Sequence, residues 1–181
     1  MLELAIATTD VTTAQALTRG LGGTLYADER QIPDLPFHAL ATVITDDLET
    51  LAAIADVGLY LVYRRLLKSG LPAVVGLFPL IRRPSLTHRE ADDHWRDIHA
   101  PLALEHHGFM THYTQLSVVH TFVGVPYDGF ALCGFKTTED LRQRFYSGPD
   151  SRPIIAADVE NFADTARSPR RLVTSMTRYD S

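Results

Sequence analysis

Histidine is the residue type whose spacing carries the strongest chemical signal in this chain. Seven of its eight histidines follow Gly70, and five of them lie with the single tryptophan in residues 87–108. An imidazole titrates near neutral pH and can both accept and donate a proton, so histidines beside an apolar pocket suit general acid–base catalysis. The pattern predicts that any chemistry lies in the second half of the chain.

Residues 87–108 are predicted to be helical. Glu90 follows Thr87 at the spacing of a capping box, which marks the start of a helix. At about 100° per residue, four apolar side chains share one stripe that we expect to face the core. These side chains are Ala91, Trp95, Ile98 and Leu102.

The histidines beside this stripe are the candidate catalytic groups. His99 and His106 lie on one flank of the stripe and His94 on the other, whereas His107 points away toward solvent. A histidine beside a buried indole is partly desolvated, which keeps it neutral and basic near pH 7. We expect His99 to be the leading general base or acid, and both His99 and His106 to border a dry cavity under the later sheet. Pro101 can shift His106 from this angle, because proline disturbs helical hydrogen bonding.

A long strand predicted over residues 109–122 supplies a further candidate. Tyr113 and His112 lie on opposite faces of that strand, so only one of them can face the helices, and hydrophobicity leaves the choice open. Either Tyr113 or His106 is expected to act as second proton donor or to orient the substrate. The expected substrate-binding residues are Trp95, His94, Phe109, Phe130 and Phe145.

Several other chemistries are disfavoured by the motifs. His94 and His99 are five residues apart and His99 and His106 are seven apart, so neither pair has the four-residue spacing of a helical zinc site, and we expect no metal. The glycine-rich nucleotide fingerprints do not occur in the sequence. Cys133, the single cysteine, excludes an internal disulfide and is expected to be a small buried side chain.

Composition narrows the class of protein. The 181 residues carry a formal net charge of −5 and a pI near 5.9, which argues against nucleic acid or an anionic membrane as partner. No apolar run reaches the 18 or so residues that would span a bilayer, and no basic segment precedes the apolar start of the chain. We therefore expect a cytoplasmic protein.

The chain reads as two halves with the same order of elements. Residues 1–68 and residues 73–181 are each predicted to be β-α-β-β-α-β, which is typical of ferredoxin-like units with an antiparallel sheet covered by helices on one face. The predicted strands are residues 2–8, 24–26, 37–45, 59–63, 73–81, 109–122, 129–135 and 171–179. Each sheet leaves one face uncovered, so the predicted fold is α+β, with two tandem units whose sheets pack face to face as an α/β barrel.

The second half resembles a known family. The pattern Trp95-x-x-x-His99-x-Pro101-Leu102, on a helix that follows a strand ending in basic residues, resembles the EthD-like domain, and Asp158-x-x-x-Phe162 looks like the C-terminal signature of that family. The resemblance covers residues 73–179. It implies a dimeric α/β barrel of two ferredoxin-like sheets, with a pocket between a sheet and its helices. The first half, without those motifs, is a degenerate unit that could supply the second sheet within one chain, which leaves a homodimer open.

The resemblance also implies small-molecule chemistry, namely decarboxylation, cyclisation, isomerisation or cofactor-free oxygenation of aromatic or polyketide-like compounds. We therefore expect a cofactor-independent lyase or isomerase that acts on a small apolar or aromatic molecule by histidine general acid–base catalysis. Two alternatives stay open. One is a non-catalytic small-molecule carrier or accessory protein, and the other is a haem-binding or monooxygenase-type protein on the same barrel.

Overall fold

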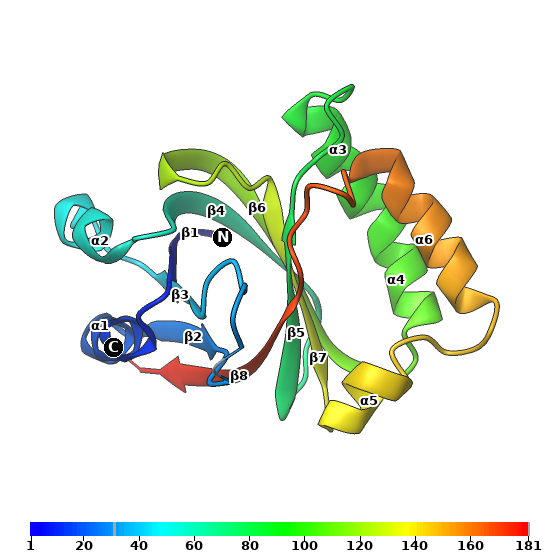
Figure 1. Cartoon of the computed structure of the whole chain (residues 1–181), viewed down its shortest axis with the longest axis horizontal. Coiled ribbons are helices and arrows are strands. Elements are labelled where there is room, and N and C mark those ends of the chain that lie inside the picture. Colours follow the sequence, from blue (N-terminus) through cyan, green and yellow to red (C-terminus); the bar gives the residue numbers. More distant parts are fainter. Residues whose placement is uncertain (31, 181) are drawn as a thin grey trace.

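The chain forms two consecutive β-α-β-β-α-β units (Figure 1). The computed structural model describes residues 1–30 and 32–180, so positions 31 and 181 of the two predicted halves lie outside the described residues. The first unit contains β1 (Leu2–Thr8), α1 (Val11–Leu21), β2 (Gly23–Ala27), β3 (Ala39–Val43), α2 (Leu48–Ile54) and β4 (Gly58–Lys68). The second contains β5 (Val74–Leu80), α3 (His88–His94), η1 (Trp95–His99), α4 (Ala100–His106), β6 (Met110–Gly124), β7 (Gly129–Phe135), α5 (Thr138–Gln143), α6 (Ser151–Phe162) and β8 (Leu172–Tyr179).

The two units close one antiparallel barrel. Within the units the strand orders are β4-β1-β3-β2 and β8-β5-β7-β6, which is the same order twice. The outer strands of one unit pair with those of the other, β2 with β8 and β4 with β6, and these pairs join the two sheets into a closed ring of eight strands. The predicted α+β fold of two ferredoxin-like units forming a barrel is confirmed.

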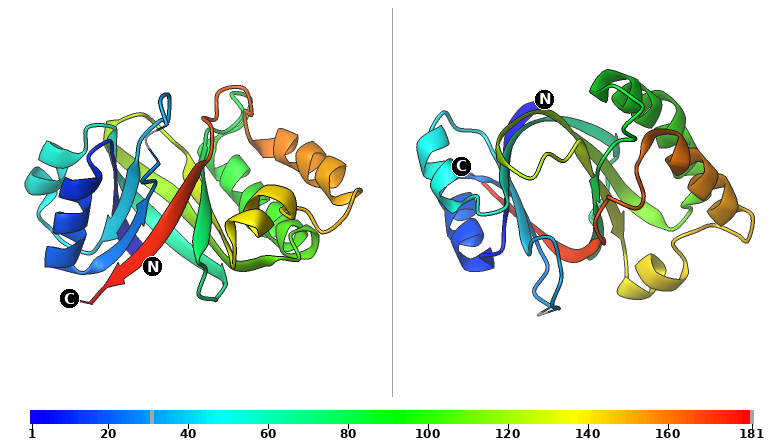
Figure 2. Two further views of the ribbon diagram at one scale, coloured as in Figure 1. Left: turned by 60° about the horizontal axis from the view of Figure 1, so that its bottom comes forward. Right: turned by 45° about the horizontal axis from the view of Figure 1, so that its top comes forward.

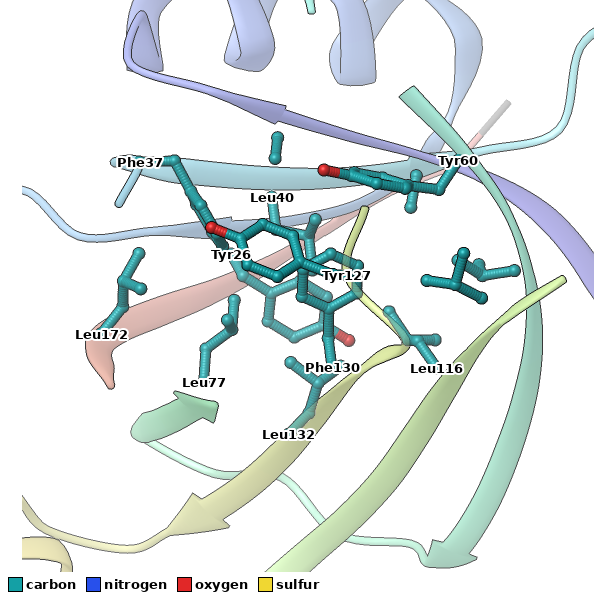
Figure 3. Packing of buried hydrophobic residues seen from close by; sticks show 14 of the residues in the cluster. Tyr26, Phe37, Leu40, Tyr60, Leu77, Leu116, Tyr127, Phe130, Leu132 and Leu172 are labelled. Carbon is teal, nitrogen blue, oxygen red and sulfur yellow. The ribbon is translucent and has the colours of Figure 1, made fainter. Parts of the chain in front are cut away.

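The barrel interior is packed with side chains (Figure 3). Four aromatic rings meet at its centre, with ring centroids 5.4–6.2 Å apart and mostly edge-to-face. These rings belong to Phe37, Tyr60, Tyr127 and Phe130. Leucines from both units surround them, including Leu40, Leu77, Leu116, Leu132 and Leu172. Because the centre is filled, the barrel is a hydrophobic core shared by the two units.

The helices cover the outer faces of the two sheets on opposite sides of the barrel (Figure 2). Helices α1 and α2 cover the first unit, and α3 to α6 cover the second. The predicted capping box is present at the start of α3, where the Thr87 hydroxyl accepts from the Glu90 N–H and the Glu90 carboxylate accepts from the Thr87 N–H. None of the described helices is long and apolar enough to cross a membrane.

A side chain of the first unit holds the histidine helix of the second. Arg65 on β4 makes a two-pronged ion pair with Asp92 on α3, with nitrogen–oxygen distances of 3.0 and 2.6 Å. The same guanidinium lies 5.4 Å from the centre of the Trp95 ring. The first unit therefore helps to position the helix that carries the candidate residues.

Replacing Phe130 by alanine tests the filled barrel. Phe130 is fully buried, so Phe130→Ala should lower the free energy of unfolding by about 3–5 kcal/mol, because it leaves a cavity among the aromatic rings. Phe109→Ala is the matched control: Phe109 is 41% exposed, and its loss should cost less than about 1 kcal/mol. Urea unfolding of both variants provides the measurement. Equal losses would contradict this assignment of Phe130.

Candidate functional site

The helix that carries the histidines contains a π-helical turn. Between α3 and α4, residues Trp95–His99 form η1, and the N–H of Ala100 donates to the carbonyl of Trp95, five residues earlier. A π turn holds one residue more than an α-helical turn, so every later side chain changes its angle around the axis. The predicted stripe is correct as far as Trp95 and wrong after it.

The side chains that follow the π turn are displaced by one position. Ile98, predicted to be buried, is 54% exposed. The residues of this helix that are buried are Ala91, Trp95, His99, Ala100, Ala103 and His107. His107 therefore takes the inward position that regular α-helical spacing would have given to His106, and the expectation that His107 faces solvent is wrong.

Two local features account for the π turn. Pro101 has no backbone N–H and cannot bond to the carbonyl four residues earlier. The Trp95 carbonyl also accepts a hydrogen bond from the side-chain amide of Gln115 on β6, at 3.0 Å. A side chain of the sheet thus donates a hydrogen bond to a carbonyl of the π turn.

Asp158 on α6 joins two histidines across this turn. One carboxylate oxygen lies 2.7 Å from Nδ1 of His99, and the other lies 2.8 Å from Nε2 of His94. In a regular α-helix, positions five apart diverge by about 140° around the axis. The wider turn between His94 and His99 allows both rings to reach one carboxylate.

These contacts assign the protons on the rings. An ionised carboxylate can only accept hydrogen bonds, so His99 carries its proton on Nδ1 and His94 carries its proton on Nε2. No hydrogen bond to Nε2 of His99 occurs among residues 1–30 and 32–180. The neutral His99 ring therefore has an unprotonated nitrogen opposite Asp158.

The environment of His99 is apolar. Its residue exposure is 9%, and the Phe162 ring lies 5.1 Å from it between centroids and stacks on His94 at 5.2 Å. Burial lowers the pKa of His99, while the hydrogen bond and charge of Asp158 act in the opposite direction. His99 is consequently neutral near pH 7, with a carboxylate placed to stabilise the protonated ring.

A cavity of about 480 Å³ lies between the second sheet and its helices, and we call it the histidine cavity. Helices α4 and α6 run side by side over it (Figure 1). Its walls are mainly apolar and aromatic, and its polar groups include His99, His107 and Tyr113. The side chains that line it include Trp95, His99, His107, Tyr113, Cys133, Phe145 and Phe162. Such a chamber suits a small, largely apolar molecule.

His107 is the second imidazole of the cavity. Its Nδ1–H donates to the carbonyl of Phe145 at 2.7 Å, and the Phe145 and Tyr146 rings pack against it with centroids 4.3 and 5.3 Å away. The pKa of His107 is lowered to about 4, chiefly by burial, and the charges of His99 and His106 act in the same direction. His107 is therefore neutral at pH 7, with Nε2 left as an acceptor.

Tyr113 settles which face of β6 meets the helices. Its ring is buried and lines the cavity, and its hydroxyl accepts a hydrogen bond from the Gln115 amide at 3.0 Å. Burial raises the pKa of the Tyr113 phenol above its ordinary value and raises that of the neighbouring Cys133 thiol to about 12. Tyr113 can thus donate a proton in a hydrogen bond, whereas Cys133 stays an inert, buried thiol.

The structure brings only some of the predicted site residues together. Trp95, His99, Tyr113 and Phe145 line the cavity. His94, predicted to bind substrate, does not line it, because its ring is turned to the Asp158 carboxylate, which also binds His99. His106 does not line it: its Nδ1 lies 3.0 Å from the Ser151 hydroxyl.

The two other predicted aromatic walls lie elsewhere. Phe130 faces the barrel interior. Side chains alternate between the two faces of a strand, so Ala131 and Cys133 on the opposite face of β7 line the cavity. Phe109 is largely exposed and packs under the guanidinium of Arg144.

Two residues of the site were missed as functional groups. His107 could not be found by regular helical spacing, because the π turn displaces it. The sequence indicates Asp158 only as part of a family signature, although an acid on the apolar stripe of a helix that also carries Phe162 is a usable signal, and the structure buries it. Among the described residues no cluster of three or more histidines, cysteines or acids could hold a metal ion.

The low pKa of His107 predicts a pH dependence of stability. The unfolded chain protonates this ring below about pH 6.5, whereas the folded protein does so only near pH 4. Stability from the neutral ring is complete above pH 6.5 and is lost as the pH falls toward 4. Urea unfolding at about pH 7.5 and about pH 5 should show a smaller loss for His107→Gln than for the wild type. The same loss in both proteins would contradict the burial of a neutral ring.

Comparison with solved structures places the whole barrel among known folds. An anthrone oxidase-like protein superposes with a TM-score of 0.58 at 12% identity, covering 99% of this chain and 93% of that one. A "putative monooxygenase" from Lactobacillus acidophilus NCFM gives 0.51 at 7% identity, covering 98% and 92% of the two chains. Another from Fusobacterium nucleatum subsp. nucleatum ATCC 25586 gives 0.50 at 9% identity, covering 99% and 96%. At these identities the likeness shows a shared fold.

Comparison at the level of sequence gives one family. No curated protein matches the chain. Residues 83–166 match the EthD domain family, and this stretch includes the whole histidine helix, Tyr113, Asp158 and Phe162. Over residues 83–166 the chain is therefore similar to the EthD domain family.

Proposed function

We propose that this protein is an enzyme that transfers a proton on a small aromatic or polyketide-like molecule, with His99 as the general base. One observation carries the proposal: the Asp158 carboxylate binds Nδ1 of His99 at 2.7 Å, while the same ring lines the histidine cavity. A carboxylate that holds an imidazole by one nitrogen leaves the other unprotonated and basic.

The proposed step begins with a substrate whose acidic C–H or O–H group lies against Nε2 of His99. That nitrogen takes the proton, and the ring becomes an imidazolium whose charge is balanced by Asp158. Because the site is largely apolar, this ion pair interacts more strongly than it would in water. His94 and Phe162 hold the Asp158 carboxylate and the His99 ring in place.

Two further polar groups can act on the rest of the substrate. The buried Tyr113 hydroxyl can donate to an oxygen that gains negative charge, such as an enolate or phenolate oxygen. His107 is neutral and has a free acceptor nitrogen, so it can hold a substrate hydroxyl. Together they favour a substrate with a carbonyl or phenol on an apolar ring system.

Proton abstraction of this kind begins a cofactor-independent isomerisation or cyclisation. In a decarboxylation, the lyase case, the substrate carboxylate leaves as CO₂ and the protonated His99 ring gives its proton to the resulting enolate carbon. A second candidate is oxygenation, which is favoured by the names of the similar structures, an anthrone oxidase-like protein and monooxygenases. In that case the same carbanion or phenolate would react with O₂. Oxygen consumption, measured with an electrode during turnover, separates the two.

Replacing His99 tests the base. Aromatic ketones and β-keto acids, incubated with the protein in D₂O, should exchange their acidic protons or lose CO₂, as followed by NMR. His99→Gln should slow this by about 10²- to 10⁴-fold, because the general base is removed. His120→Gln is the matched control, since His120 is exposed on β6, and it should keep the wild-type rate.

The outcome separates the alternatives. Full activity in His99→Gln would overturn the assignment. Retention of the compounds without any turnover in the wild type would instead favour a carrier, and a Soret band after addition of haem would favour a haem protein.

Replacing Asp158 tests the positioning of the base. Asp158→Asn keeps the size of the side chain but removes the charge that raises the pKa of His99. The rate should fall, because the tautomer and the charge of the protonated ring are no longer supported. The acid limb of the pH–rate profile should also move to lower pH, since the His99 pKa falls further. A lower rate with an unmoved limb would indicate a purely structural role.

A further inference from the structure

A second hollow adjoins the histidine cavity and has the opposite character. It measures about 550 Å³, is open to solvent, and shares three aromatic side chains with the cavity, Phe78, Phe145 and Tyr146. The remaining wall includes three guanidinium groups, from Arg142 on α5, Arg152 on α6 and Arg171 before β8. We call this the arginine hollow.

The positive charge of the hollow is not balanced by its own walls. None of its lining residues is acidic, and within residues 1–30 and 32–180 none of the three arginines forms an ion pair. The neighbouring arginines differ: Arg30 is bound by Asp28, and Arg144, which follows the last residue of α5, is bound by Asp140. Guanidinium groups stay protonated in proteins, so three like charges converge here without a counter-ion.

Arg171 is held in a position to bind a ligand. Its guanidinium lies 5.9 Å from the centre of the Phe78 ring and 5.8 Å from that of Phe145, so two side chains of the shared wall support it. It is partly buried, and burial together with the charge of Arg142 lowers its pKa. A partly buried cation with a like charge beside it is stabilised when an anion binds between them.

We propose that the arginine hollow binds an acidic group, a carboxylate, sulfonate or phosphate, of a molecule whose aromatic or aliphatic body lies in the histidine cavity. The inference rests on the proposed function, because it names the substrate class of the same site: an aromatic acid in place of a neutral aromatic compound. A planar guanidinium matches the two oxygens of such a group, and Arg142 and Arg152 extend the recognition to the open side.

Two fluorescent probes with the same rings test this. Anilinonaphthalene sulfonate carries an acidic group, and phenylnaphthylamine lacks it. Isothermal titration should show that the wild type binds the sulfonate at least about tenfold more tightly, as expected for a charge-assisted contact. The indole N–H signal of Trp95, the single tryptophan, should shift with both probes, because both occupy the histidine cavity.

Variants then locate the charge that is responsible. Arg171→Met keeps an apolar stem over the aromatic rings and should weaken sulfonate binding by about ten- to a hundredfold, with less than about a twofold change for the neutral probe. Arg142→Met and Arg152→Met remove exposed charges, and each should weaken only the binding of the sulfonate. Arg144→Met, the same change at the paired arginine that follows α5, should leave both affinities unchanged.

Three results would overturn the proposal: equal affinity of the wild type for both probes, equal weakening of both probes by Arg171→Met, or an effect of Arg144→Met as large as that of Arg171→Met. The test is independent of catalysis. His99→Gln should preserve the difference between the probes. If His99→Gln loses turnover but the wild type shows no preference between the probes, the proposed function stands and this inference fails. If His99→Gln keeps full turnover but the wild type prefers the sulfonate, this inference stands and His99 is not the base.

Discussion

The site depends on one backbone hydrogen bond, the bond from the Ala100 N–H to the Trp95 carbonyl that closes the π turn. With a regular α-helix in its place, His94 and His99 would diverge around the axis, and one carboxylate could not hold both. The same turn moves His107 into the cavity and Ile98 out to solvent. The π turn thus determines which histidines face the cavity. The sheet supports the turn through Gln115, and α6 supports it through Asp158.

Much of the architecture could be predicted because it depends on local patterns that the chain repeats. The β-rich residues 2–8, the short apolar run of residues 129–135 and the Thr87 capping box are signals that tertiary contacts do not override. The pairing of β2 with β8 and of β4 with β6 depends on packing between distant segments, and was anticipated only as two sheets facing each other. Phe130 shows the limit: the sequence placed it on one face of a strand, but both faces of that strand are buried.

The site was harder to predict than the fold for two physical reasons. Helical spacing assumes a constant angle per residue, and the π turn between Trp95 and His99 does not have that angle. Regular spacing therefore predicts that His106 borders the cavity, whereas His107 does so. The partner of His99 is also 59 residues away, on a separate helix, where spacing carries no information. Trp95 could be predicted because it stands at the start of the π turn, and His99 because it follows that buried indole closely. For Tyr113 the sequence left open which face of β6 meets the helices.

Closure of the barrel has a consequence for how the chain must be made. During synthesis the first unit emerges first, with the edges of β2 and β4 unpaired, and β8 follows the other seven strands. Until β8 leaves the ribosome the ring cannot shut, and the nascent sheet presents bare backbone groups that can template strand addition from neighbouring chains. Slow translation between β4 and β8 would therefore lengthen the interval in which aggregation competes with completion of the ring.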